Sequence, residues 1–331
     1  MNILVANNHL KRTGGTENYT YALIVELLRL GHEVEYFTFK KGVVSKKIEE
    51  LGVRFRSKKN YDLILANHKT TVQLLHKRGY TIQTCHGVLP TLEQPSRYAD
   101  AYVSVTPEVH RHLQNQGIDS VLIYNGIDCQ RFYPKKELRQ QLSCVLSLCQ
   151  SDEANELLEK VCRRNNLTLL RADKKKDGIW QLEELINEAD LVVGIGRSLY
   201  DAMACGRTVL SFDQRKYSDA FGDGYLTEQS IENSIQFNCS GRGSKRRIDA
   251  SVLESELLRY NPQDGTFMRS FALKHTNIEH SVQQYLAVYA KRDRSAGKSY
   301  GLCNSFLWSC KAGLSLIPSF STTSFVKRFS R

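Results

Sequence analysis

One segment in the second half of the chain combines an apolar run, two glycines and a carboxylate at a spacing that suits a nucleotide. Leu191–Val193 predicts a strand, Gly194 and Gly196 predict a turn, and the small residues after them predict a helix. Backbone N–H groups at the start of that helix and the Asp201 carboxylate would converge on one ligand. A dinucleotide fingerprint needs a third glycine where this chain has Leu199, which disfavours a redox enzyme.

A second glycine pair, Gly14 and Gly15, precedes a predicted helix whose Thr16 can cap its N-terminus. Two consecutive glycines let backbone N–H groups approach a phosphate, and the helix dipole favours the anion. A turn that needs positive φ explains the pair equally well. His86 follows another predicted strand and precedes a glycine, which would place its imidazole at the mouth of a cleft. By itself, a histidine at a strand end is more often structural than catalytic.

These motifs lie on an alternating pattern of strands and helices. Such alternation predicts an α/β fold with parallel sheets that are covered on both faces and bind ligands at the carboxyl ends of their strands. A chain of 331 residues with 41% apolar content can bury two cores, and Pro134 with the polar run after it interrupts the pattern. Strands are predicted at 3–6, 34–39, 53–55, 63–66, 81–84, 101–105, 121–124, 144–148, 167–170, 191–193 and 208–212, and helices near 16–30, 153–162, 182–189 and 281–290.

Four segments resemble, in the same order, motifs of the retaining family 4 glycosyltransferases, which have the two-domain GT-B fold. The resemblance implies two Rossmann-like domains that face each other across a cleft. Residues 1–134 would form the acceptor-side domain, residues 135–280 the nucleotide-sugar domain, and residues 281–331 a return helix and a basic amphipathic tail. It also implies transfer of a sugar from a nucleotide diphosphate with its anomeric configuration retained. The matching segments are Thr13–Asn18, Thr84–Gly87, Tyr124–Asp128 with Phe132 and Pro134 after it, and Asp201–Leu210.

The resemblance also implies roles for single residues. Asp201 matches the family's second motif acid, which receives both ribose hydroxyls, and His86 matches a histidine near the transferred sugar. Glu17 matches a position that orders the glycine loop or meets the acceptor. An acid in the first turn of a helix also complements the helix dipole, so both acids have a purely stabilising alternative. We therefore predict His86 and Glu17 as catalytic residues, and as donor-binding residues Gly14, Gly15, Gly194, Gly196, Arg197, Ser198 and Asp201.

The chain departs from the family pattern at two places. The family's first motif acid falls on Val193, and the strand that begins near residue 144 lacks the usual Arg and Lys that neutralise the diphosphate. Arg197 is the best-placed replacement because a guanidinium offers a bidentate fork to phosphate; Arg171 and Lys174–Lys176 are alternatives. No Asp-x-Asp motif or zinc-like spacing occurs, so we expect metal-independent chemistry without a cofactor. By family analogy the donor would be of the UDP or GDP type.

Cysteine usage and charge bear on location. The nine cysteines are scattered without a Cys-x-x-Cys pair, which is typical of a reducing cytosol. We expect no signal peptide and no transmembrane helix, because no charged leader with an apolar core and no run of eighteen apolar residues occurs. The segment from Lys291 to Arg331 carries eight Lys or Arg against one Asp, among apolar and aromatic residues. It suits an anionic membrane surface, although a tail packed on the N-terminal domain or a disordered end are alternatives.

Together these features predict a cytoplasmic hexosyltransferase, peripheral at the inner membrane face, that extends a lipid-linked surface glycan such as a lipopolysaccharide or O-antigen. Its partners would be a nucleotide-sugar, a glycan or lipid-linked acceptor and the membrane, and no nucleic acid. Two alternatives stay open. The first is a non-catalytic GT-B module that supports a partner enzyme, and the second is a nucleotide-sugar epimerase.

Overall fold

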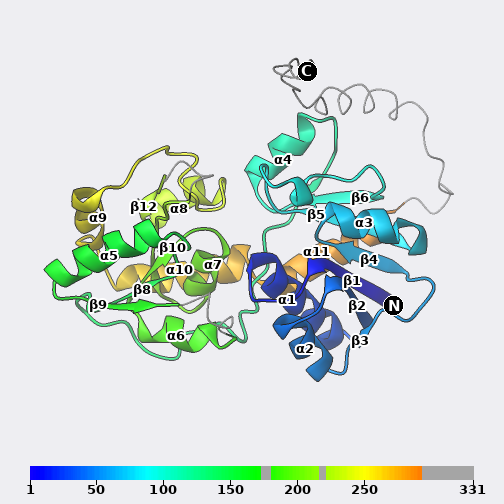
Figure 1. Cartoon of the computed structure of the whole chain (residues 1–331), viewed down its shortest axis with the longest axis horizontal. Coiled ribbons are helices and arrows are strands. Elements are labelled where there is room, and N and C mark those ends of the chain that lie inside the picture. The colour runs from blue at the N-terminus through cyan, green and yellow to red at the C-terminus, as the bar shows by residue number, and fades with distance from the viewer. Residues whose placement is uncertain (173–179, 216–220, 293–331) are drawn as a thin grey trace, which may run out of the picture. The chain divides into compact units, whose positions relative to one another are not determined.

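The structure of the protein is a computed structural model that describes residues 1–172, 180–215 and 221–292 (Figure 1). The residues up to Ala290 form one unit. The predicted basic tail and the Lys174–Lys176 run lie outside the described residues. Within these ranges the strands form two separate sheets, and no helix is long and apolar enough to cross a membrane.

The first sheet is parallel throughout and has β1 near its centre, between β2 and β4. Most residues of β1 are buried because helices cover both faces of the sheet, which explains why its sequence is a continuous apolar run and not an alternating one. The strand order is β3-β2-β1-β4-β5-β6-β7. The strands are β1 (Asn2–His9), β2 (Glu33–Lys40), β3 (Arg54–Phe55), β4 (Leu63–Ala66), β5 (Tyr80–Cys85), β6 (Ala101–Ser104) and β7 (Val121–Leu122).

The helices around this sheet include the last described helix of the chain. Ile278, Val282 and Tyr285 of that helix pack into the core formed by β1, α1 and their neighbours, so the chain returns to the first sheet after building the second. The α-helices are α1 (Gly15–Arg29), α2 (Val43–Glu50), α3 (Lys69–Leu75), α4 (Pro107–Gln114) and α11 (Ile278–Ala290), and the 3₁₀ turns are η1 (His76–Arg78) and η2 (Thr91–Glu93).

The second sheet has the order β12-β11-β10-β8-β9 and is parallel except for β12, which pairs antiparallel with β11. Its strands β8, β10 and β11 are fully buried, with helices packed on both sides. These two α/β layers confirm the predicted fold class. The strands are β8 (Cys144–Ser147), β9 (Thr168–Arg171), β10 (Leu191–Gly194), β11 (Thr208–Ser211) and β12 (Gly224–Tyr225). The helices are α5 (Asp152–Arg164), α6 (Leu182–Glu188), α7 (Arg197–Ala204), α8 (Glu228–Ile235), α9 (Ala250–Leu257) and α10 (Gln263–His275).

The predicted elements match the observed ones apart from their ends. β1 runs on to His9 although its apolar run stops at Ala6. The extension is possible because Asn7, which is fully buried, donates its side-chain amide to Thr20 Oγ1 of α1 at 2.9 Å. A buried polar residue thus continues the strand and carries the chain to the loop where the glycine pair lies.

A short chain of hydroxyl groups holds α11 against the first sheet. The Tyr285 hydroxyl lies 2.9 Å from the Tyr19 hydroxyl of α1 and 2.7 Å from Thr84 Oγ1 of β5, and both tyrosines are fully buried. Removing the central hydroxyl would leave two buried groups without their partner, which costs about 1 to 3 kcal/mol.

We therefore expect Tyr285→Phe to lower the free energy of unfolding by about 1 to 3 kcal/mol and to speed amide hydrogen exchange in α11. Urea unfolding followed by circular dichroism, together with hydrogen exchange, measures both effects. Tyr133→Phe is the matched control because Tyr133 is 43% exposed. Unchanged exchange in α11 would mean that apolar packing alone holds this helix.

Candidate functional site

A cavity of about 350 Å³ lies where the carboxyl ends of strands from both sheets approach each other. One wall comes from the loops after β1, β5 and β7, and the other from the loops after β8, β10 and β11 and from the start of α7. This is the arrangement in which parallel α/β sheets bind ligands. The lining residues are Thr13–Thr16, Asn18, His86–Pro90, Glu93, Asn125, Gln150, Ala172, Leu182, Ile195–Ser198, Asp201, Arg215, Asn238, Ser240 and Arg242.

The first glycine loop lines the cavity at the start of α1. Gly14 is the N-cap residue and its backbone is extended, so its conformation does not require glycine. A Cβ at Gly14 would meet only Glu17 Oε2, the end of a flexible side chain that can move aside, so space does not strictly require glycine either. No atom approaches the corresponding position at Gly15. The loop therefore presents bare backbone to the cavity at the positive end of a helix, as an anion site requires.

Glu17 lies behind this loop and does not line the cavity. It is only 4% exposed, and its Oε1 atom is 3.0 Å from His9 Nδ1. The hydrogen bond to Glu17 raises the pKa of His9, which opposes the effect of burial. These contacts fit the loop-ordering role of Glu17, and its predicted catalytic role stays a prediction.

The second glycine turn leads into α7. Gly196 adopts a φ of 63°, in the left-handed region that favours glycine, and a Cβ there would lie 2.9 Å from Asn238 Nδ2. No side chain caps α7, so the N–H groups of its first turn, which includes Ser198, face the cavity wall. Gly194 is outside the lining, and a Cβ there would make an ordinary packing contact, 3.4 Å from Leu148 Cβ.

Arg197 and Asp201 both line the cavity and contact each other along α7. Arg197 is 8% exposed, and its Nε atom lies 3.5 Å from Asp201 Oδ1. Its Nη1 atom donates to the Gly126 carbonyl at 2.9 Å, in the loop after β7. Arg197 thus lines the cavity, and part of its guanidinium joins the two walls, while its role in phosphate binding stays a prediction.

His86 lines the cavity as a neutral imidazole. Its Nε2 donates to Asn67 Oδ1 at 3.1 Å, and Tyr19 packs against its edge with ring centroids 5.4 Å apart. Burial, with the neighbouring His68 and Arg197, lowers the pKa of His86 to about 3. His86 can therefore orient a ligand through a neutral ring, but it carries no charge near neutral pH.

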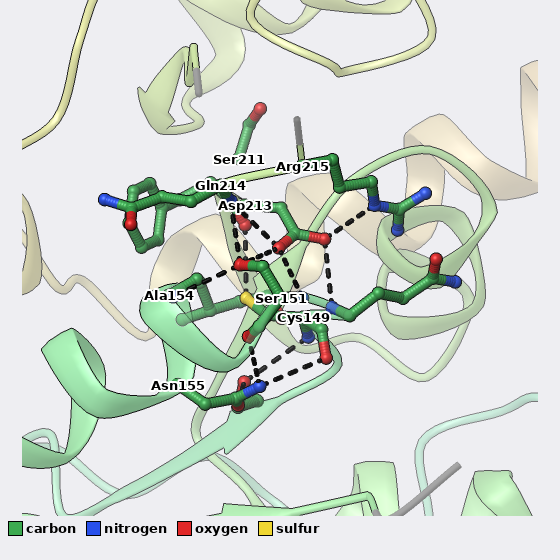
Figure 2. Close-up of polar contacts among 12 residues, drawn as sticks. Cys149, Ser151, Ala154, Asn155, Ser211, Asp213, Gln214 and Arg215 are labelled. Carbon is green, nitrogen blue, oxygen red and sulfur yellow. Dashed lines mark hydrogen bonds and ion pairs between the residues drawn. The ribbon is translucent and has the colours of Figure 1, made fainter. Parts of the chain in front are cut away.

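Arg215 is a cavity residue that no sequence motif predicted. Figure 2 shows that Asp213 lies between Arg215 and the start of α5, and it accepts from Arg215 Nε at 2.7 Å. The same carboxylate accepts from the Gln150 and Ser151 backbone N–H groups at 3.0 and 3.2 Å. Arg215 is thereby held at the cavity edge, close to the loop after β8. No motif surrounds it, so the sequence offered no signal.

Glu93 is a further cavity residue that no motif indicated, whereas Arg242 belongs to the segment Asn238–Arg242, which we had expected to reach the cleft. Arg242 Nε donates to Glu108 Oε1 of α4 at 2.9 Å and forms a second bond to the other carboxylate oxygen. The Glu108 backbone N–H donates to the Gln236 carbonyl at 3.0 Å. The segment before Arg242 is thus tied to α4 across the cavity. Burial and the charge of Glu17 raise the pKa of Glu93 to about 7.

Among the described residues, no group of three or more His, Cys, Asp or Glu side chains is arranged to hold a metal ion. The Val193 side chain is fully buried and packs in the core of the second sheet.

Comparison with known proteins is informative only at the level of structure, since no protein-family model and no curated protein matches the chain. A glycosyltransferase from Rickettsia africae is similar over 88% of this chain and 99% of its own, with a TM-score of 0.59 and 14% identity. An α-glucosyltransferase solved with UDP and a 13-mer DNA covers 88% and 99%, with a TM-score of 0.53 and 10% identity. The catalytic domain of starch synthase IV from Arabidopsis thaliana, bound to ADP and acarbose, covers 88% and 98%, with a TM-score of 0.52 and 11% identity. At these identities the likeness is one of fold, and the fold of this chain is the two-sheet GT-B fold.

Proposed function

We propose that the protein is a glycosyltransferase that moves a sugar from a nucleoside diphosphate to the hydroxyl of an acceptor. One observation carries this proposal: a single cavity brings together two glycine-led helix starts, Arg197, Arg215 and Asp201. Helix N-termini and guanidinium groups suit a diphosphate, and a carboxylate suits ribose hydroxyls. The similar starch synthase, which was solved with ADP and acarbose, supports the same ligand class.

In this proposal different residues of the cavity bind different parts of the donor. The α7 start and the free edge of Arg197 would bind the diphosphate, and Arg215 would supply the second cation that the family takes from elsewhere. Asp201 would bind the ribose, and His86 would line the sugar position. We infer a UDP- or GDP-type donor, no metal or other cofactor, and retention of the anomeric configuration, all from the resemblance of the motifs.

The acceptor side of the cavity has exposed apolar residues. Leu89, which lines the cavity, is 56% exposed, and Leu92 is 40% exposed in the same loop. They support a lipid-linked surface glycan as the acceptor, which the composition of the tail would help to bring to the cytoplasmic membrane face. The likeness to an α-glucosyltransferase solved with DNA weighs against the expectation that no nucleic acid binds, so an oligonucleotide belongs in the acceptor panel.

A non-catalytic nucleotide- or glycan-binding module is the second candidate function. The observation that favours it is Val193, which is fully buried where the family carries its first acid. An epimerase on this fold has no separate supporting observation.

The first test is a thermal-shift panel of UDP-, GDP-, ADP- and dTDP-linked sugars, followed by measurement of nucleoside diphosphate release. A ligand that binds only the folded state stabilises it by about 2.7 kcal/mol at one hundred times its dissociation constant. We expect one base class to raise the melting temperature and its sugar nucleotides to be turned over. A shift without turnover would favour the non-catalytic module, and no shift with any base would contradict both.

Asp201→Asn tests the ribose contact while preserving size next to Arg197. We expect the wild-type protein to bind the preferred nucleoside diphosphate more tightly than its 2′,3′-dideoxy form by about 1.5 to 3 kcal/mol, and the variant to lose most of this difference. Calorimetry with both ligands measures it, with the exposed Asp119→Asn as control. A preference that survives in the variant would leave Asp201 as a partner of Arg197 only.

Arg197 is tested by comparing a nucleoside diphosphate with the free nucleoside. If the guanidinium binds phosphate, Arg197→Ala should weaken the diphosphate much more than the nucleoside, and Arg197→Lys should recover part of the loss because it keeps the charge but not the fork. Loss of the hydrogen bond from Arg197 to Gly126 would weaken the binding of both ligands, so only a change in the ratio of their two affinities reports phosphate contact. Equal losses would exclude phosphate contact.

A further inference from the structure

The segment Asn238–Arg242, which follows α8, brings an amide side chain to the start of α7. Its first two residues, Asn238 and Cys239, both have positive φ, 59° and 47°, although neither is a glycine. Asparagine adopts this left-handed conformation more readily than most residues, but two such residues in succession are uncommon. Strained backbone of this kind is concentrated at binding sites, and Asn238 lines the cavity.

Hydrogen bonds from the body of the second sheet hold this segment in place. The Cys239 backbone N–H donates to the Ser234 carbonyl at 2.8 Å, and the Cys239 carbonyl accepts from Ser211 Oγ at 2.9 Å. The Gly241 backbone N–H donates to Asp223 Oδ2 at 3.1 Å. None of these bonds uses the Asn238 side chain, so the backbone of the segment is fixed without it.

A buried hydroxyl orients the Asn238 side chain. Tyr200 of α7 is 1% exposed and donates its hydroxyl to Asn238 Oδ1 at 3.0 Å. Burial raises the pKa of Tyr200 well above its usual value, so the hydroxyl keeps its proton and remains a donor. Because the oxygen of the amide accepts this bond, the Nδ2 group faces Gly196, where a Cβ would lie 2.9 Å from it. Gly196 therefore leaves room for an amide donor beside the N-cap of α7.

The Asn238 amide is positioned to bind a ligand and not another part of the protein. Within residues 1–172, 180–215 and 221–292, Asn238 Nδ2 makes no hydrogen bond, so its N–H groups remain for a ligand. It lies beside the uncapped start of α7, where the helix dipole favours an anion. A neutral amide adds a directed hydrogen bond there without adding charge, which Arg197 and Arg215 already supply at the same cavity.

We propose that Asn238 is a donor-binding residue whose amide Nδ2 donates to a non-bridging oxygen of the bound diphosphate, an inference that rests on the proposed function. Tyr200 is then a positioning residue, because its hydroxyl determines which end of the amide faces the ligand. The contact concerns binding of the diphosphate and requires no particular stereochemical course of the sugar transfer.

Asn238→Gly tests the proposal, because glycine keeps the left-handed backbone and removes the amide. We expect the variant to bind the preferred nucleoside diphosphate about 10-fold to 100-fold more weakly, the range for a lost hydrogen bond to a charged group, and to bind the free nucleoside as the wild type does. Calorimetry with both ligands measures the two affinities. Asn166→Gly is the matched control, because Asn166 also has a positive φ, 55°, but is exposed and away from the cavity.

Tyr200→Phe tests the positioning role, because it keeps the amide and removes the bond that orients it. We expect it to weaken the diphosphate by a smaller factor than Asn238→Gly. If Tyr200 acts only through Asn238, the double variant should bind the diphosphate no more weakly than Asn238→Gly alone. Losses that multiply in the double variant would overturn the positioning role.

Asn238→Asp provides a second variant that keeps the size of the side chain, the left-handed backbone and the bond from Tyr200. Its carboxylate would complement the dipole at the start of α7, so we expect the free protein to be at least as stable as the wild type in urea unfolding. The nucleoside diphosphate should nevertheless bind at least as weakly as in Asn238→Gly, because a donor has become a charged acceptor. A purely structural role predicts that this stable variant binds normally.

The outcomes separate this inference from the proposed function. Equal losses for the diphosphate and the nucleoside in Asn238→Gly, or wild-type affinity for the diphosphate in either variant of Asn238, would overturn the proposal while leaving the proposed function intact. A wild-type protein that binds no nucleoside diphosphate would contradict the proposed function first, and the role of Asn238 would fail with it.

Discussion

The buried guanidinium of Arg197 is the constraint on which the rest of the site depends. A charge with 8% exposure is costly unless it is paired, and here the Gly126 carbonyl and the Asp201 carboxylate provide the partners. Because Gly126 lies in the loop after β7, satisfying this charge fixes the start of α7 against the other wall of the cavity. Gly126 itself is tightly packed, since a Cβ there would lie 2.8 Å from Ile278 Cα. The arginine thereby connects the second sheet to the helix that returns to the first.

This arrangement links ligand binding to the geometry of the walls. A phosphate bound to Arg197 would compete with the Gly126 carbonyl for the N–H groups of the guanidinium. A ribose hydroxyl bound to Asp201 would compete with the same guanidinium for the carboxylate oxygens. On the opposite side, Glu108 and Arg242 form a second tie of the same kind between α4 and the segment after α8. The cavity therefore lies between two charged contacts, Arg197 with Asp201 and Arg242 with Glu108.

The fold could be predicted from the sequence because the patterns that indicate strands, turns and helices each lie within a short segment of the chain. Apolar runs marked the buried strands, and the positive φ of Gly196 explains why a glycine precedes α7. The site was only partly predictable, since its other members come from segments that are distant in sequence. Arg215 depends on Asp213 and the start of α5, and nothing around residue 93 resembles a motif. Glu17 illustrates the opposite difficulty, because its motif position is clear but only the structure shows that its carboxylate faces His9 and Gly14 and not the cavity.

The two carboxyl groups of the cavity differ in what surrounds them. The Asp201 carboxylate lies beside a guanidinium, with its Oδ1 atom 3.5 Å from Arg197 Nε. Glu93 is buried near a second carboxylate, and both conditions favour the protonated form. Val193 is buried in the core of the second sheet, whereas Glu93 places a carboxyl group in the cavity wall formed by the loop after β5. The two carboxyl groups of the cavity thus lie in different walls and in different electrostatic surroundings, because one faces an arginine and the other is close to a further carboxylate.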